Sequence, residues 1–405
     1  MATVRPVRRG PTIAVVALAA AVLGGLVALL VATVTGLTDG KTTTVYVPTT
    51  ASEVGSGNEP IVRAAPLGGK GFTPSRIYTA RSPGVVTVFA FFDNADEQEA
   101  QGSGFVVTPS GYILTSAHVV TDVVESAHPS EAHEVFIAFK DQDRVKAKIV
   151  GWDGYDDVAL LKVDPATHPL VTVPLGDSSR TRPGDPVAAM GSPFGNEDSI
   201  AVGVVSAIHR SISSLTSSFK VVDAIQTDAP ITHGNSGGPL FDARGRVIGI
   251  NAQIRSDSGG AEGVGFAVPI NAAKRSMGQL IATGQVVYAF LGVTTEDLTP
   301  TLARHLGYGV SRGAIVGEVR GGSPADHAGL EGGTDEQSVN GLTVTTGGDV
   351  IVAVNGHPVR SADQVVRDIG SRLPGETITL TVVRGQERKT LNAKLGARPD
   401  ADTNH

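Results

Sequence analysis

The amino-acid sequence predicts a mainly β protein with more than one folded domain, behind a single membrane-spanning helix. The chain has 405 residues, which exceeds what one compact core normally holds. Its 50 glycines and 23 prolines indicate many turns rather than long helices. Between residues 75 and 284, short β-branched runs alternate with turn residues, which is typical of β-barrels or a β-sandwich.

The composition excludes several classes of protein. A formal net charge of -7 and an isoelectric point near 5.8 do not supply the clustered Lys and Arg of a nucleic-acid surface. The absence of cysteine excludes disulfides, cysteine-ligated zinc and a thiol nucleophile. His128 and His133 lack metal-ligand spacing such as His-Glu-x-x-His. We therefore expect no metal, no cofactor and no nucleic acid.

The N-terminal region carries the membrane prediction. Thr12–Thr35 holds no charged residue and, as a helix, is long enough to cross a hydrocarbon core of about 30 Å. Arg5, Arg8 and Arg9 precede this segment, so the positive-inside rule leaves residues 1–11 in the cytoplasm and the rest outside the cell membrane. The alternative is a cleaved secretory signal, whose apolar region is shorter, roughly 7–15 residues, and ends in a cleavage site that is not evident here.

The remainder divides into a linker and two domains. Residues 36–74 are rich in Thr, Gly, Pro and Ser and predict a flexible linker. Residues 75–285 form the first domain, which the helix Asn271–Ile281 closes. Residues 286–398 form a small α+β domain, and residues 399–405 a tail. The expected strands of the first domain are Val85–Phe91, Gly104–Val107, Tyr112–Leu114, Val135–Phe139, Ala147–Val150, Val158–Val163, Val187–Met190, Ala201–Ile208, Arg246–Ile250 and Val264–Val268; those of the second are Ala314–Val319, Val350–Val354 and Thr377–Val383, with the helix Ser361–Leu373.

The segment Gly234-Asn235-Ser236-Gly237-Gly238-Pro239-Leu240 places a serine among glycines. A serine nucleophile needs a tight turn whose N–H groups face the developing oxyanion, here those of Gly234 and Ser236. Taken alone, the pattern also fits an ordinary glycine-rich turn.

Two further residues complete a candidate triad. His118 directly follows the apolar run Tyr112–Leu114 and could act as base, although a histidine beside valines is more often a core residue. Asp157 opens the strand Val158–Val163 and could orient the imidazole as a buried acid. Asp156 remains an alternative, because strand starts are uncertain by a residue or two.

Thr-Ser-Ala-His, Asp-Val-Ala-Leu-Leu-Lys and Gly-Asn-Ser-Gly-Gly-Pro-Leu, in this order, resemble the HtrA/Deg family of chymotrypsin-fold serine proteases over about residues 78–284. The resemblance implies two six-stranded antiparallel β-barrels, cleavage of unfolded or damaged polypeptides, and homotrimers. Thr232-His233 departs from the Asn-Pro usual in relatives.

The residues around the serine also predict specificity. Pro230, six residues before Ser236, stands where proteases that cut after Lys or Arg carry an aspartate. With Ile231 on one wall and Asn251–Ile254 on the other, the pocket should prefer small apolar residues such as Val or Ala.

The second domain resembles a PDZ domain over about residues 286–395. Phe290-Leu291-Gly292-Val293 is similar to the loop that captures a peptide's C-terminal carboxylate, although the pattern alone also fits a plain strand start. Ala314–Val319 and Ser361–Leu373 would line the peptide groove. A Gly- and Thr-rich insertion is expected between Leu330 and Gly347.

Two other functions compete with a protease. A binding scaffold with inactive barrels would not need the complete set of triad residues. An α/β-hydrolase esterase would carry its residues in the order Ser, acid, His, which is the reverse of the order here.

Overall fold

The computed structural model describes residues 71–92, 99–122, 130–192, 199–213, 220–231, 234–252 and 264–399. The segment Thr12–Thr35, for which the sequence predicts a membrane span, and most of the predicted linker lie outside these residues. Within them, no helix combines the length and the apolar character needed to span a bilayer.

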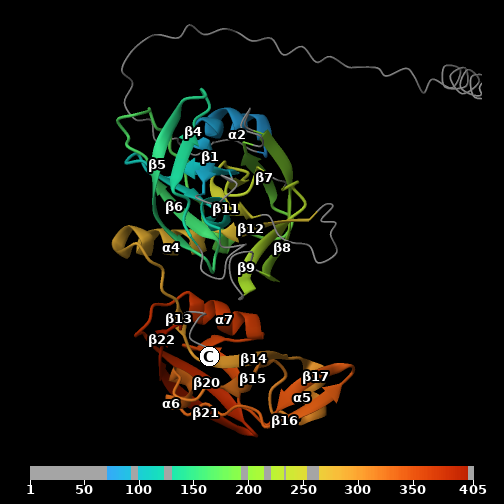
Figure 1. The fold of residues 1–405 in the computed structure, drawn as a ribbon. Helices are drawn as coiled ribbons and strands as arrows, with labels where there is room; N and C mark the ends of the chain where they lie inside the picture. The colour runs from blue at the N-terminus through green and yellow to red at the C-terminus, as the bar shows by residue number, and fades with distance from the viewer. Residues whose placement is uncertain are drawn as a thin grey trace, which may run out of the picture. The chain divides into compact units, whose positions relative to one another are not determined.

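The first β-barrel closes six antiparallel strands in the order β1-β2-β3-β6-β5-β4 (Figure 1). Its interior is filled by side chains such as Val86, Ile113 and Leu161, each at most 1% exposed. Alternate residues of each strand point inward. The predicted strands match β1, β3, β4 and β6 to within a residue at each end, whereas those for β2 and β5 cover only part of the observed strands. The strands are β1 (Val85–Phe91), β2 (Glu99–Val106), β3 (Tyr112–Thr115), β4 (Glu134–Ala138), β5 (Arg144–Asp153) and β6 (Val158–Lys162).

The second β-barrel also closes six antiparallel strands, in the order β10-β11-β12-β9-β8-β7. The sequence pattern predicts no strand at β9 or β10, and it predicts that β8 ends at Ile208. Three register shifts between β8 and β9 bend this long pair around the barrel, and such irregularities break the alternation that predicts a strand. The strands are β7 (Pro186–Gly191), β8 (Ser199–Ser213), β9 (Lys220–Thr227), β10 (Pro239–Asp242), β11 (Val247–Ala252) and β12 (Gly265–Pro269).

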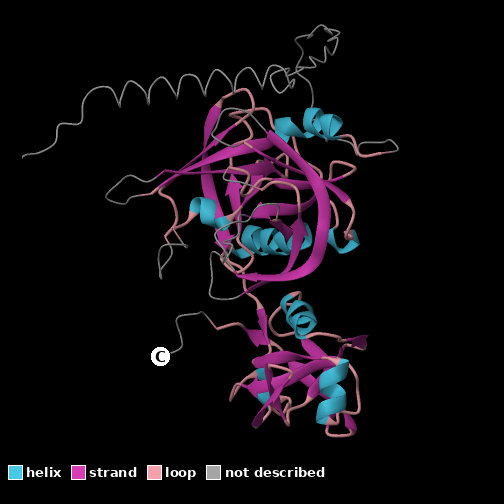
Figure 2. Cartoon of the chain, turned by 90° about the vertical axis from the view of Figure 1, so that its right-hand side faces the viewer, coloured by secondary structure: helices cyan, strands magenta, loops and turns pink. Residues whose placement is uncertain are grey.

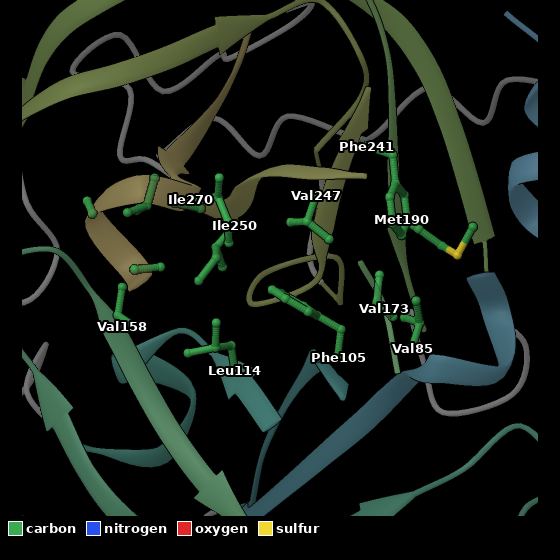
Figure 3. Packing of buried hydrophobic residues seen from close by; sticks show 14 of the residues in the cluster. Val85, Phe105, Leu114, Val158, Val173, Met190, Phe241, Val247, Ile250 and Ile270 are labelled. Carbon is green, nitrogen blue, oxygen red and sulfur yellow. The ribbon is translucent and has the colours of Figure 1, made fainter. Parts of the chain in front are cut away.

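A shared apolar core joins the two barrels (Figure 3). Phe105 and Leu114 of the first barrel and Phe241 and Ile250 of the second are fully buried in it. Burying one such side chain contributes about 1.5–3 kcal/mol. Helix α4 (Ile270–Thr283), close to the predicted bounds, adds Ile270 to this core. The two barrels are therefore packed as one domain, which fixes residues of one barrel against residues of the other.

The C-terminal domain is a sheet in the order β14-β15-β18-β20-β21, with β19 beside β18 and a separate pair β13-β22. Figure 2 shows that strands dominate the described chain and that its helices are short. The strands are β13 (Ala289–Phe290), β14 (Val293–Leu298), β15 (Gly313–Val319), β18 (Val350–Val354), β19 (His357–Pro358), β20 (Thr377–Arg384), β21 (Glu387–Lys394) and β22 (Gly396–Ala397), and the helices are α5 (Pro300–Leu306), α6 (Pro324–His327) and α7 (Ala362–Gly370).

The predicted insertion forms a hairpin of its own. Strands β16 (Asp335–Val339) and β17 (Leu342–Thr346) pair with each other around Asn340 and Gly341. Both turn residues have positive φ, 53° and 81°, as a two-residue type I′ turn requires. The Asn-Gly pair thus explains why the added segment folds as a hairpin.

Candidate active site

His118 and Asp157 are held together by the first barrel. His118 lies in the short helix α3 (Ala117–Val120) directly after β3, and Asp157 lies directly before β6. Because β3 pairs with β6, both residues come to the same end of the barrel. His118 Nδ1 lies 2.8 Å from Asp157 Oδ2, and the His118 backbone N–H donates to Asp157 Oδ1 at 3.0 Å. The described structure gives Asp156, the alternative acid, no hydrogen bond to His118.

Burial and the neighbouring Asp157 have opposite effects on the pKa of His118. Burial by itself would lower the pKa of His118, because it penalises the charged ring. The charge of Asp157 and its hydrogen bond act in the opposite direction and together raise the pKa of His118 above its usual value. The pair can therefore stabilise an imidazolium, the form that a general base adopts after accepting a proton.

Ser236 lies in a tight turn before β10, in the second barrel. It is 5% exposed, and its Oγ has no hydrogen-bond partner among the described residues. The turn contacts the segment before His118, since a Cβ on Gly237 would lie 2.4 Å from Thr115 Oγ1 and 2.9 Å from Ser116 N. With a φ of 82° as well, position 237 requires glycine. The inter-barrel contact thus brings Ser236 next to the His118 and Asp157 pair.

The backbone N–H groups of Gly234 and Ser236 are available to a ligand. Neither donates a hydrogen bond to another residue in the part of the chain that the structure describes. Gly234 has a φ of 97°, and the neighbouring turn is fixed by the bonds from Gly238 N to Asn235 O at 2.9 Å and from Gly237 N to Asn251 O at 2.8 Å. Thr232 and His233, which depart from the family pattern, lie outside the described residues.

Ser103, on β2, holds the turn that contains Ser236 in place, although the sequence pattern gives it no role. Its N–H donates to Ser236 O at 2.8 Å, and its Oγ donates to Gly234 O at 2.5 Å. The same Oγ accepts the N–H of Ser192 at 2.8 Å, and Ser103 O accepts the Thr115 hydroxyl at 2.7 Å. The only sequence signal for it is the run Gly102-Ser103-Gly104-Phe105, whose small residues let the two barrels approach each other.

The residues predicted to form the substrate pocket lie in different environments. Pro230 is exposed and Ile231 is half-buried, packed against the core of the second barrel. Asn251 is fully buried, and its amide donates to Met190 O at 3.1 Å and to Pro239 O at 3.3 Å. Its side chain therefore ties β11 to its neighbours. The rest of the predicted wall, residues 253 and 254, lies outside the described residues.

The predicted carboxylate loop Phe290–Val293 leads from β13 into β14. The N–H groups of Leu291 and Gly292 donate to none of the described residues, while Gly292 O accepts Arg320 N at 2.9 Å. Gly292 has a φ of 87°, and a Cβ there would lie 2.3 Å from the Cβ of Ser323. Two N–H groups on a rigid turn are suited to an anionic end group.

The expectation that Ala314–Val319 would line the groove is wrong. That segment is β15, which lies between β14 and β18, and its residues Ala314 to Val316 are fully buried. The edge strand is β14, which pairs only with β15 among the described strands, and α7 packs on the sheet through Val365 and Ile369. A peptide that adds a strand to this sheet would therefore pair with β14, because β15 already has a strand on each side.

No group of three or more His, Asp or Glu side chains in the described ranges is arranged to hold a metal ion.

Comparisons with known proteins agree with this geometry. Residues 102–250 match the model of the trypsin-like peptidase domain, and residues 289–395 match that of the PDZ domain. A probable periplasmic serine endoprotease, DegP-like, of Pseudomonas putida is 38% identical over 310 residues, which is 76% of this chain and 59% of the relative. A protein of the same description from Hahella chejuensis is 40% identical over 307 residues, 75% of this chain and 59% of its own length.

The solved structures cover both domains. The HtrA-type protease AlgW with a tripeptide is similar with a TM-score of 0.66 and 33% identity, over 82% of this chain and 99% of that one. A serine endoprotease from Yersinia pestis is similar with a TM-score of 0.56 and 27% identity, over 81% and 98% of the two chains. With two closed barrels, a trypsin-like peptidase match and a PDZ domain behind it, this chain belongs to the HtrA-type serine proteases.

Proposed function

We propose that this chain is a serine endopeptidase in which Ser236 is the nucleophile, His118 the general base and Asp157 the acid that orients it. The observation that carries the proposal is the 2.8 Å contact between His118 Nδ1 and Asp157 Oδ2, with the Ser236 turn packed against Thr115 and Ser116. Asp157 favours the tautomer with the proton on Nδ1, so the Nε2 lone pair is free to take a proton from Ser236.

In the first step, Ser236 Oγ attacks the carbonyl carbon of the scissile bond while His118 Nε2 takes its proton. The carbonyl oxygen becomes an oxyanion that the N–H groups of Gly234 and Ser236 stabilise. His118 then donates the proton to the leaving amine. In the second step, water attacks the acyl-enzyme with His118 again as base, which restores Ser236.

The hydrogen bond between Ser236 and His118 is the one contact of the proposed triad that is not made among the described residues. Ser236 Oγ lacks a partner among the described residues, while the bonds between His118 and Asp157 are made. This arrangement supports a resting site in which a bound substrate completes the contact. Catalytic hydrogen bonds of this kind commonly tighten only in the substrate complex.

We infer that the substrates are unfolded or damaged polypeptides outside the cytoplasm, cut after small apolar residues. The names of the DegP-like relatives describe periplasmic endoproteases, and two AlgW structures carry a tripeptide or a decapeptide. The chain spans about 59% of the length of the first of these relatives. Half-buried Ile231 and uncharged Pro230 support the apolar preference, because no carboxylate stands there to pair with Lys or Arg.

We also propose a membrane anchor at Thr12–Thr35, C-terminal peptides as ligands of the PDZ domain, and a homotrimer. The uncharged N-terminal segment supports the first, and the free N–H groups of Leu291 and Gly292 support the second. The trimer rests on the family alone. Intact mass of protein extracted from membranes tests the anchor, because a soluble form that starts near residue 36 would instead indicate a cleaved signal.

Casein digestion by the chain from Gly71 onward, wild type beside Ser236→Ala, tests the catalytic assignment. We expect a loss of about 10⁴-fold or more, because the hydroxyl is the nucleophile. His118→Ala should match it, and Asp157→Asn should be severe. Digestion by Ser236→Ala at near the wild-type rate would exclude Ser236 and favour a different site or a binding role.

A further inference from the structure

Asp153, the last residue of β5, is a second buried acid, 1% exposed, and it directly precedes the turn between β5 and β6. Its Oδ1 accepts the backbone N–H of Tyr155 at 3.0 Å and that of Asp156 at 3.3 Å. These bonds fix the backbone of the turn whose last residue is Asp157. Asp153 therefore acts on the proposed catalytic acid through the chain and makes no contact with the reacting atoms.

The other carboxylate oxygen of Asp153 accepts two hydroxyl groups. Ser276 Oγ, from α4, donates at 2.6 Å, and the Tyr288 phenol donates at 2.5 Å. Tyr288 follows α4 and directly precedes β13, so it lies in the segment that joins the protease domain to the PDZ domain. Among the donors that the described residues supply to Asp153, Tyr288 alone comes from that segment.

The turn needs such support because Asp157 has an unfavourable backbone. Its φ is 52°, in the left-handed region, which costs a non-glycine residue about 1–2 kcal/mol. The surroundings must hold this conformation, and Asp157 at that φ is what makes both hydrogen bonds with His118. A looser turn would let the strained residue relax and would displace the carboxylate.

Electrostatics make this support sensitive to protonation. Burial raises the pKa of Asp153, and the hydrogen bonds from Ser276 and Tyr288 oppose that rise. The acid Asp156 and the cations Arg275 of α4 and Arg398 after β22 face the same cluster. A protonated Asp153 carries a hydroxyl group of its own and cannot accept all four hydrogen bonds.

We propose that Tyr288 is a positioning residue for the catalytic acid: its phenol, through Asp153, holds the turn that presents Asp157 to His118. The proposal rests on the triad assigned above. It makes the segment between the two domains part of the support of the protease site. Without the phenol, Asp153 takes up a proton at a higher pH, and the turn loses its hold on Asp157 there.

The test is the rate at which a fluorophosphonate probe labels Ser236 in the full-length chain between pH 5.5 and 8.5. Tyr288→Phe removes one hydroxyl and keeps the ring. We expect labelling to slow about tenfold near pH 6 and about threefold or less at pH 8.5, because one hydrogen bond to a buried carboxylate is lost. Tyr112→Phe, which removes the phenol of β3, is the matched control and should label at the wild-type rate.

Tyr288→Phe in a second variant protein distinguishes a role in positioning Asp157 from a general loss of stability. In a background that carries both Asp153→Asn and Asp156→Asn, the side-chain shapes and acceptor oxygens remain but neither acid that faces the phenol titrates, so Tyr288→Phe should there have the same small effect at every pH. Circular dichroism checks that each variant is folded, and Ser276→Ala, which removes the other hydroxyl, should repeat the pH-dependent loss. Wild-type labelling of Tyr288→Phe at all pH values, or a loss of the same size at every pH in the otherwise wild-type chain, would overturn the proposal. A wild-type label found on a residue other than Ser236 would instead reject the triad assignment.

Discussion

Ser103 shows how one small residue can support an active site without taking part in the reaction. It is fully buried and makes hydrogen bonds to the backbone of Ser236, Gly234 and Ser192. Its carbonyl oxygen also accepts the hydroxyl of Thr115. These bonds span both barrels, so they set the position of the nucleophile relative to His118. A serine suits the place because its hydroxyl both donates and accepts, and because larger side chains would separate the barrels.

We expect Ser103→Ala to weaken catalysis more than it disturbs folding. The change leaves the Ser192 N–H and the Gly234 carbonyl without their hydroxyl partner, at a cost of about 1–3 kcal/mol in unfolding free energy. Because Gly234 is one of the two proposed oxyanion donors, kcat/KM should fall at least tenfold, within the cost of up to about 10³ for losing such a donor. Urea unfolding and peptide hydrolysis measure the two effects, and Ser110→Ala on the surface is the control. Unchanged kcat/KM would show that the turn holds its shape without Ser103.

At the scale of elements, the end of β5 and the turn that follows it place two acidic side chains close together. Asp153 is buried, and half-buried Asp156 lies beside it. Burial, and then the charge of Asp153, raises the pKa of Asp156 to about 7. The two acids therefore titrate as a pair, and the proton of Asp156, lost while Asp153 is charged, leaves well above the usual range for carboxyl groups.

Because of this pair of acids, we expect the free energy of unfolding to fall as pH rises. The unfolded chain releases the Asp156 proton near pH 4 and the folded chain near pH 7, so the folded state binds more protons between these values and loses stability across them. Asp156→Asn removes this loss. We expect the variant to gain about 2 kcal/mol relative to wild type between pH 4.5 and pH 8, roughly half the full linkage value because the side chain is partly exposed.

Urea unfolding at both pH values measures this difference. Asp141→Asn is a control of opposite sign, since a hydrogen bond with His168 lowers the pKa of Asp141; its effect should be small because the carboxylate is exposed. Parallel curves for wild type and Asp156→Asn would show that Asp156 keeps an ordinary carboxyl group in the folded protein.

At the scale of the whole molecule, the chain combines a trypsin-like peptidase domain with a PDZ domain, for which we propose peptide binding. Peptides that end in a free apolar carboxylate should bind at Phe290–Val293 with an affinity on the order of micromolar, because a short peptide loses much conformational freedom on joining β14. We expect such binding to raise the rate of reporter cleavage. Amidation should weaken binding sharply, since the neutral end no longer attracts the N–H groups of Leu291 and Gly292.

Calorimetry on the Ser236→Ala chain, which leaves the peptides intact, measures binding, and the wild-type chain measures cleavage. Gly292→Ala should abolish binding through its 2.3 Å approach to Ser323. Gly307→Ala, with a φ of 72° and no atom within 4 Å of the added Cβ, is the matched control for backbone strain alone. Equal binding of free and amidated peptides would reject the carboxylate loop, and binding without a change in rate would leave tethering as its role.

The sequence alone determined those helices and strands whose formation depends on neighbouring residues in the chain. Short β-branched runs between turn residues located β1 and β18 to the residue, and apolar periodicity located α4 and α7 to within a few residues. The order of the three motifs indicated the family, and the two six-stranded barrels that it implied are confirmed. The residues of the proposed triad could be selected because each motif joins a reactive side chain to a strand end or a glycine turn.

Only the tertiary structure decided what depends on contacts between distant segments. It gave Asp157 rather than Asp156 the hydrogen bonds to His118, although the two are adjacent in sequence. It revealed Ser103 behind the nucleophile turn, and it placed β14 rather than β15 at the edge of the PDZ sheet. It also joined Tyr288 to Asp153 across 135 positions of chain. Local pattern cannot predict such pairs, because their partners are chosen by how strands close into barrels and by which buried polar groups must find hydrogen bonds there.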